Sequence, residues 1–143
     1  MFKNMLVGAD NSATALRAVE AAVGLAAALG AKLHIVTAYK AVTVALPEMP
    51  PDIFYSTQVE AADELLMELT SVAKKANVEV EVHPAVGAPA TAIIDVATRV
   101  GADLIVVGNK GMRGTRRVLG SVPNSVAHHA PCAVLIVDTT GGG

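Results

Sequence analysis

One stretch in the C-terminal half combines glycine with basic residues, as a phosphate-binding loop does. Gly108, Gly111 and Gly114 recur at three-residue spacing, and a Gly120-Ser121 pair follows them. Glycines expose backbone N–H groups, and a helix that starts after Gly120 would add unpaired donors and a favourable dipole. This pattern predicts a site for a phosphate chain, or else a solvated connection whose glycines serve only turns. The stretch also holds four cations in a net-acidic chain: Lys110, Arg113, Arg116 and Arg117.

The stretch matches neither of the two common phosphate-loop patterns. The pattern G-x-x-x-x-G-K-[ST] is absent because no lysine separates Gly120 from Ser121, and the dinucleotide pattern G-x-G-x-x-G does not occur. Phosphate binding at this position would therefore use a different kind of loop.

A second candidate site lies near the N-terminus, in the run Gly8-Ala9-Asp10-Asn11-Ser12. The small residues would let a ligand approach the backbone, and the Asp10 carboxylate could meet a ribose hydroxyl or a phosphate-bound metal. Asp, Asn and Ser are also the residues that cap helices. The run therefore predicts either a binding residue at Asp10 or a turn that only starts a helix.

The remaining polar groups show no pattern of a metal site or a catalytic centre. His34 and His83 fall within expected strands, without a histidine or cysteine at metal-ligand spacing, and the adjacent His128 and His129 face different directions. The single cysteine, Cys132, starts an apolar run, which is typical of an inert core thiol. No triad or carboxylate pair can be argued from spacing, so no catalytic residue is predicted.

Length and composition restrict the class of protein. The 143 residues suffice for one domain, and a hydrophobic content of 52% excludes disorder. The aromatic content of 3% and the net charge of −2 argue against single-strand, duplex-DNA and polybasic membrane binding. The longest apolar run, 21–31, is shorter than the roughly 20 residues of a bilayer span. With one cysteine and no targeting segment, we expect a cytoplasmic protein without nucleic-acid or membrane partners.

The elements that must position these residues alternate along the chain. Five strands are expected, at 5–9, 33–39, 78–83, 103–107 and 132–137. Four helices are expected, at 13–29, 57–75, 90–100 and 121–129. Residues 40–55 are expected to form a proline-rich loop between the second strand and the second helix. Such alternation predicts an α/β fold, a five-stranded parallel sheet in the order 3-2-1-4-5 with helices on both faces, Rossmann-like. The expected domain covers 1–138 and leaves 139–143 as a flexible tail. Ligands of such sheets bind at the carboxyl ends of the strands where the order reverses, after strands one and four.

The two expected edge strands differ in character. The third alternates valines with Glu79, Glu81 and His83, so one of its faces is wet. The fifth, 132–137, is apolar on both faces and carries no charge, which makes an uncovered edge prone to aggregation. Antiparallel pairing with a second copy would cover it, so we expect a homodimer through this strand.

With these motifs the chain resembles the universal stress protein family, whose nucleotide-binding members carry G-x-x-G, a spacer of nine residues and G-[ST]. Here the match is Gly108-x-x-Gly111 and Gly120-Ser121, and the likeness extends to 6–12, 86–89, 103–108 and 120–131. The spacer Met112–Leu119 has eight residues. A shorter spacer leaves three readings open: tighter closure over the phosphates, a shorter ligand such as AMP or cyclic AMP, or lost binding.

The resemblance implies a stress-response protein that senses or sequesters an adenine nucleotide with Mg or Mn, with at most slow ATP hydrolysis. The nucleotide, ATP or else AMP or cyclic AMP, would lie across strands one and four. Val36 would offer backbone contacts to the adenine, Asp10 would hold the metal, and the glycine-rich stretch would cradle phosphates. The full set of implied binding residues is Gly8, Ala9, Asp10, Val36, Val107, Gly108, Lys110, Gly111, Arg113, Gly120, Ser121 and Val122. The alternative from another class is a dimeric interaction module of the same fold that binds no nucleotide.

Overall fold

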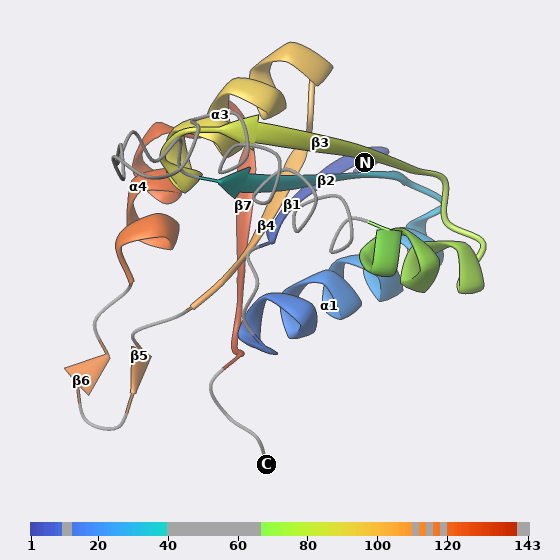
Figure 1. Cartoon of the computed structure of the whole chain (residues 1–143), viewed down its shortest axis with the longest axis horizontal. Helices are drawn as coiled ribbons and strands as arrows, with labels where there is room; N and C mark the ends of the chain where they lie inside the picture. Colours follow the sequence, from blue (N-terminus) through green and yellow to red (C-terminus); the bar gives the residue numbers. More distant parts are fainter. Residues whose placement is uncertain (10–12, 40–66, 110–111, 114–115, 118–119, 140–143) are drawn as a thin grey trace, which may run out of the picture.

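Five parallel strands form the central sheet of the computed structural model, which describes residues 1–9, 13–39, 67–109, 112–113, 116–117 and 120–139. Their order is β3-β2-β1-β4-β7, so the predicted order 3-2-1-4-5 is confirmed, with β7 as the fifth strand (Figure 1). The strands are β1 (Asn4–Ala9), β2 (Lys32–Tyr39), β3 (Val80–Val86), β4 (Leu104–Gly108) and β7 (Ala133–Val137).

Helices cover both faces of this sheet, as expected. They are α1 (Ala13–Leu29), a helix described over 67–75, α3 (Pro89–Val100) and α4 (Ser121–His129). Figure 1 shows α1 and helix 67–75 on one side of the sheet, and α3 and α4 on the other. No described helix combines the length and the apolar character that crossing a membrane requires.

Glycines in the left-handed conformation end two of the helices. Gly30 follows α1 with φ 65°, and Gly101 follows α3 with φ 69°. The Gly101 N–H donates to the Ala97 carbonyl, which satisfies one of the acceptors that a helix end leaves unpaired. The sequence predicted both stops because glycine adopts positive φ without steric cost.

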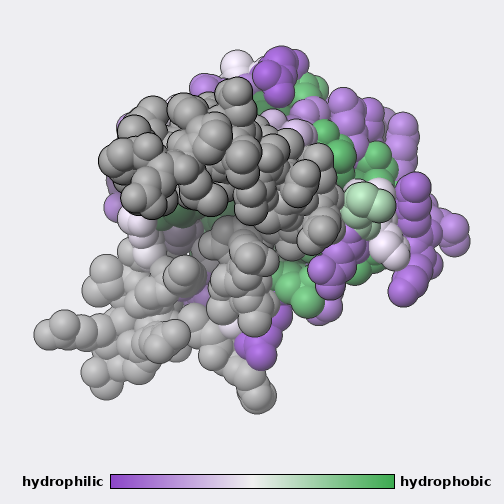
Figure 2. Space-filling model, in the orientation of Figure 1, coloured by the Kyte–Doolittle hydropathy of each residue, from purple (hydrophilic) through white to green (hydrophobic). Residues whose placement is uncertain are grey.

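Each face of the sheet has its own apolar core. On the first face, α1 and helix 67–75 pack Val19, Leu69 and their neighbours against alternate residues of the strands. On the second face, Ile93 of α3 and Val126 of α4 pack against the other alternate set. In the view of Figure 2, hydrophilic residues cover much of the described surface, with smaller apolar groups between them.

The strands at the two edges differ from β4, which lies between β1 and β7 and is buried from Leu104 to Val107. On β7 the side chain of Leu135 is 41% exposed.

The expectation of a wet face on the other edge strand, β3, is wrong for His83, because this side chain contacts His34 of β2. Strand β3 also runs to Val86, three residues beyond the predicted end.

Within the glycine-rich stretch, the structure adds a feature that the sequence did not predict. Strands β5 (Met112–Arg113) and β6 (Arg116–Arg117) pair antiparallel as a separate ribbon beyond the end of β4 (Figure 1). Two-residue strands made largely of arginine carry no alternation of apolar and polar residues, so the sequence signal for a strand is missing.

Candidate functional site

The parallel sheet opens at its carboxyl edge between β1 and β4. The register between these two strands ends at Val7 and Val106. Beyond that point Gly8 and Ala9 pair only with β2, while Val107 and Gly108 pair only with β7. The strand order reverses at this position, and open α/β sheets bind ligands at such a point.

Gly8 and its partner Val36 form one side of this opening. A Cβ atom at Gly8 would overlap the Cδ1 atom of Ile93, so close packing against α3 by itself favours a glycine here. The Val36 side chain is 1% exposed within the core beneath α3 and α4. Strands β1 and β3 flank Val36 on both sides, so the implied contact of its main chain with an adenine stays a prediction.

Gly108 and the end of β7 form the other side. A Cβ at Gly108 would lie 3.1 Å from Thr139 Cγ2, so this contact also favours glycine. Asn109, which the sequence did not single out, joins the two strand ends. Its Oδ1 accepts hydrogen bonds from Thr139 N (2.9 Å) and Thr139 Oγ1 (3.2 Å), and its own N–H donates to the Val137 carbonyl.

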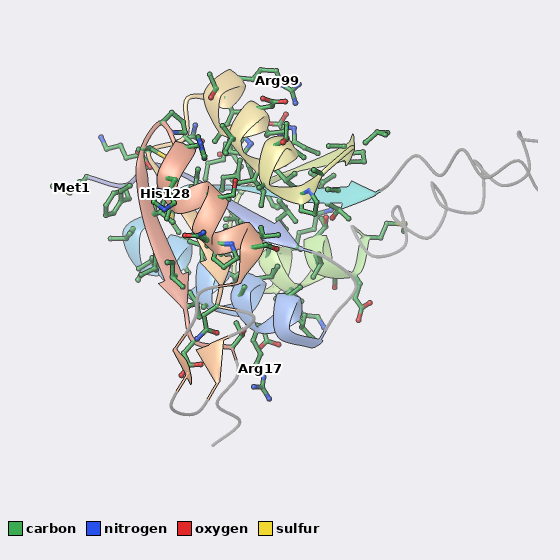
Figure 3. All side chains as sticks on the ribbon, turned by 90° about the vertical axis from the view of Figure 1, so that its left-hand side faces the viewer. Met1, Arg17, Arg99 and His128 are labelled. Atoms are coloured by element: carbon green, nitrogen blue, oxygen red, sulfur yellow. The ribbon has the colours of Figure 1, made fainter. Side chains whose placement is uncertain are left out.

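Thr139 is part of the packed structure. Its side chain is 1% exposed, and its carbonyl accepts a hydrogen bond of 2.9 Å from Arg17 Nη1 of α1. The expectation of a tail that begins at residue 139 is therefore wrong for this residue, because Asn109 and Arg17 satisfy its polar groups. Figure 3 shows Arg17 projecting from α1 at the end of the molecule where β5 and β6 lie.

The start of α4 has the features of an anion site. Gly120 is the N-cap residue and offers no side-chain cap, with φ −60° and ψ 163°. The first N–H groups of a helix lack acceptors within it, and Pro123 has no N–H. Ser121 and Val122 therefore present two N–H groups at the positive end of the helix dipole, which favours a phosphate.

Thr37 is a further group that the sequence analysis did not identify. It pairs with Ala9 at the carboxyl end of β2 and is 4% exposed. Among the described residues, its hydroxyl has no hydrogen-bond partner. A buried hydroxyl without a partner is unfavourable, so Thr37 marks a polar position beside the carboxyl end of β1 that packing alone does not explain.

Not all of the predicted site residues are described. Asp10, Lys110 and Gly111 lie outside the described residues, and Arg113 is described only as a main-chain member of β5. The carboxyl ends of β1 and β4 and the start of α4 hold seven others: Gly8, Ala9, Val107, Gly108, Gly120, Ser121 and Val122.

The cysteine and two of the histidines, which the sequence analysis did not assign to a site, lie in different environments. Burial raises the pKa of the Cys132 thiol, which disfavours the thiolate and agrees with an unreactive cysteine. The expectation that His34 and His83 lie apart from other metal-ligating groups is wrong. The parallel register of β2 and β3 brings both rings together beside Glu81.

Comparison with known proteins places these features in context. The model of the Universal stress protein family matches residues 1–138. Universal stress protein Rv1636 of Mycobacterium tuberculosis strain H37Rv is 38% identical over 150 aligned positions, which cover 97% of this chain and 98% of the relative. Its crystal structure matches with a TM-score of 0.60.

Two solved complexes share the fold. A universal stress protein crystallised in complex with cAMP is 39% identical, with a TM-score of 0.76 over 97% of this chain and 98% of the other. A universal stress protein of Archaeoglobus fulgidus in complex with dAMP is 22% identical, with a TM-score of 0.71 over 96% of this chain and 98% of the other. At that identity the second likeness concerns the fold alone.

Proposed function

The chain belongs to the universal stress protein family, and from this premise we propose that it binds an adenine nucleotide where β1 and β4 separate. One observation carries the proposal: the pairing of β1 with β4 ends at Val7 and Val106, and α4 starts at a glycine that offers no side-chain cap. The relative that is 39% identical and crystallised with cAMP supports the same ligand class.

The parts of the nucleotide match different chemical groups of this site. The adenine contacts the Val36 main chain, the ribose lies against Val107 and Gly108, and the phosphate accepts hydrogen bonds from the N–H groups of Ser121 and Val122. Residues Gly8 and Ala9 border the ligand, and Lys110, Gly111 and Arg113 complete the loop around the phosphate. Carboxylate oxygen is the ligand type that Mg or Mn prefers, so Asp10 fits a metal that accompanies a polyphosphate.

We expect one phosphate group to fit better than three. Pro123 removes the third N–H donor of α4, and the spacer Met112–Leu119 is one residue shorter than the family pattern. Two donors and a short loop suit AMP or cyclic AMP better than ATP. The protein would then sense or sequester the nucleotide rather than hydrolyse it, because no site residue other than Asp10 is an evident general base. We place this function in the cytoplasm, where a lone thiol stays reduced.

Calorimetric titration with cyclic AMP, AMP and ATP–Mg tests the proposal. We expect heat and thermal stabilisation with the two monophosphates, and weaker binding of ATP–Mg. Absence of binding with all three would contradict the proposal and favour the interaction module without nucleotide.

A matched pair of glycine variants tests the location of the site. The φ and ψ of Gly120 suit any residue, so Gly120→Leu should fold and yet block approach to the α4 N–H groups. Gly24→Leu in α1, where a Cβ meets nothing within 4 Å, is the control. We expect the Gly120 variant to lose binding and the Gly24 variant to keep it; equal affinity for both would place the phosphate elsewhere.

A homodimer through β7 is the second part of the proposal. The observation that favours it is the exposed apolar side chain of Leu135 on an edge strand without charge. Pairing of this edge with a second copy would cover it.

A further inference from the structure

A cluster of three metal-ligating side chains lies on the α3 face of the sheet, toward the amino ends of β2 and β3. In the register of these strands, His34 is the partner of Glu81, and Val36 is the partner of His83. Residues two apart on a strand share a face, so Glu81 and His83 both lie beside the His34 ring. Two strands from distant parts of the sequence thus create a spacing that no local motif reveals.

The distances within this cluster suit one ion. His34 Nδ1 and His83 Nε2 are 2.9 Å apart, and they lie 3.8 Å and 3.9 Å from Glu81 carboxylate oxygens. Zinc bonds to nitrogen and oxygen are about 2.1 Å long, so the ligand atoms of a tetrahedral site are about 3.4 Å apart. Small side-chain adjustments bring the two ring nitrogens and one Glu81 oxygen to that separation.

Asn4 fixes the tautomer that a metal needs at His34. The Asn4 Nδ2 group donates to the Val100 carbonyl at 2.8 Å, so Asn4 Oδ1 is the atom that faces His34 Nε2, also at 2.8 Å. The His34 Nε2 atom must therefore carry a proton, which leaves the Nδ1 lone pair directed at His83 and Glu81. Metal-binding histidines commonly donate their second ring N–H in this way.

The burial of the two rings also suits a metal. His34 is 3% exposed, the His83 side chain is 12% exposed, and the Glu81 side chain is 50% exposed, so the cluster is enclosed on one side and open on the other. Burial lowers the pKa of both His34 and His83, which keeps the rings neutral and able to ligate at neutral pH.

The charged groups around the histidine pair are Lys32, Glu79, Glu81 and Arg99. Two of them, Lys32 and Arg99, are positively charged and oppose a bound cation. Lys32 Nζ contacts Glu81 Oε2 at 3.0 Å, and the other oxygen, Oε1, is the one that lies 3.9 Å from His83 Nε2.

We propose that His34, Glu81 and His83 bind a divalent transition metal of the zinc class, at a site distinct from the nucleotide site. Two imidazoles and one carboxylate are a ligand set typical of zinc, and they leave a fourth position for water or a substrate atom. The alternative is a hydrogen-bonded histidine pair that only joins β2 to β3.

Titration of the metal-free full chain, without a polyhistidine tag, distinguishes the two. We expect one Zn²⁺ to bind per chain by calorimetry, and Co²⁺ to give the visible absorption of a tetrahedral complex. His83→Gln and Glu81→Gln should remove that absorption; Glu81 is half exposed, so the second variant keeps the test valid where the first does not fold. Asn4→Ala should lower zinc affinity about 10- to 100-fold, with circular dichroism showing that the protein remains folded.

The control is the double variant His128→Gln/His129→Gln, which removes a histidine pair that is exposed on α4. We expect it to bind zinc as the unaltered chain does. Absence of zinc binding, or binding that this double variant abolishes and Glu81→Gln does not change, would overturn the proposal.

Discussion

Asn109 shows how much a single side chain contributes at the carboxyl edge of the sheet. Its Oδ1 atom accepts two hydrogen bonds from Thr139, and its Nδ2 donates to Asp138 Oδ1 at 3.2 Å. The sequence placed Asn109 inside a glycine-rich stretch but offered no reason to separate it from a loop residue. Its role depends on Thr139, which is distant in sequence and becomes its neighbour only when β4 and β7 pair.

Replacement of Asn109 by alanine should destabilise the fold. The variant leaves the buried N–H of Thr139 without an acceptor, which costs about 1–3 kcal/mol of unfolding free energy. Urea denaturation measures the difference. The control is Asn124→Ala, because Asn124 is exposed on α4. Equal stability of the two variants would mean that the Asn109 hydrogen bonds are not retained in solution.

The neutral pair His34 and His83 predicts a pH dependence of stability. Both pKa values lie below the usual 6.5, chiefly because of burial, so the unfolded chain binds more protons than the folded chain as pH falls through that value. The unfolding free energy of the metal-free protein should therefore decrease from pH 7 toward pH 5. The double variant His34→Gln/His83→Gln should show a flatter profile, measured by urea denaturation at each pH. A steep profile that survives the double variant would contradict this assignment.

At the scale of elements, the sequence predicted what local chemistry determines and missed what depends on pairing. The bounds of α1 and the stop at Gly101 follow from local signals, namely a 3.6-residue apolar period and glycine at the end of the helix. The β5–β6 ribbon and the contact between His34 and His83 depend on register. No single segment of the chain contains that information.

Gly8 illustrates the same distinction within the candidate site. The sequence suggested that its small size serves a ligand, whereas the structure shows that packing against α3 also favours it. Gly8→Ala should cost about 1 kcal/mol of unfolding free energy, because the added methyl group displaces the buried Ile93 side chain. The substitution Ile93→Val removes the overlapping methyl group. The double variant Gly8→Ala/Ile93→Val should therefore lose less unfolding free energy than the two single variants lose together. Urea denaturation of the four proteins of this double-mutant cycle measures the difference. Strict additivity would mean that the two side chains do not meet.

At the scale of the whole molecule, the exposed edge strand β7 predicts a homodimer. Leu135→Lys places a charge in the middle of the exposed edge strand, so it should yield monomer or insoluble protein. Sedimentation at micromolar concentration gives the measurement. The matched control is Met67→Lys, which adds the same charge at a side chain that is 74% exposed on helix 67–75. A native monomer, or a soluble dimer of the Leu135 variant, would exclude this interface.

The central position of β1 has a consequence for the synthesis of the chain. Residues 4–9 leave the ribosome before β4 does, yet Met5, Leu6 and Val7 are fully buried and pair with β4, about a hundred residues later. The Asn4 N–H likewise donates a hydrogen bond to the Asp103 carboxylate, which is 99 positions later in the chain. Contacts of such long range form slowly, and an apolar strand without its partners is prone to association. The nascent chain therefore carries the future centre of its sheet without β4 while about a hundred residues are synthesised, and the sheet can be completed only after β7 emerges.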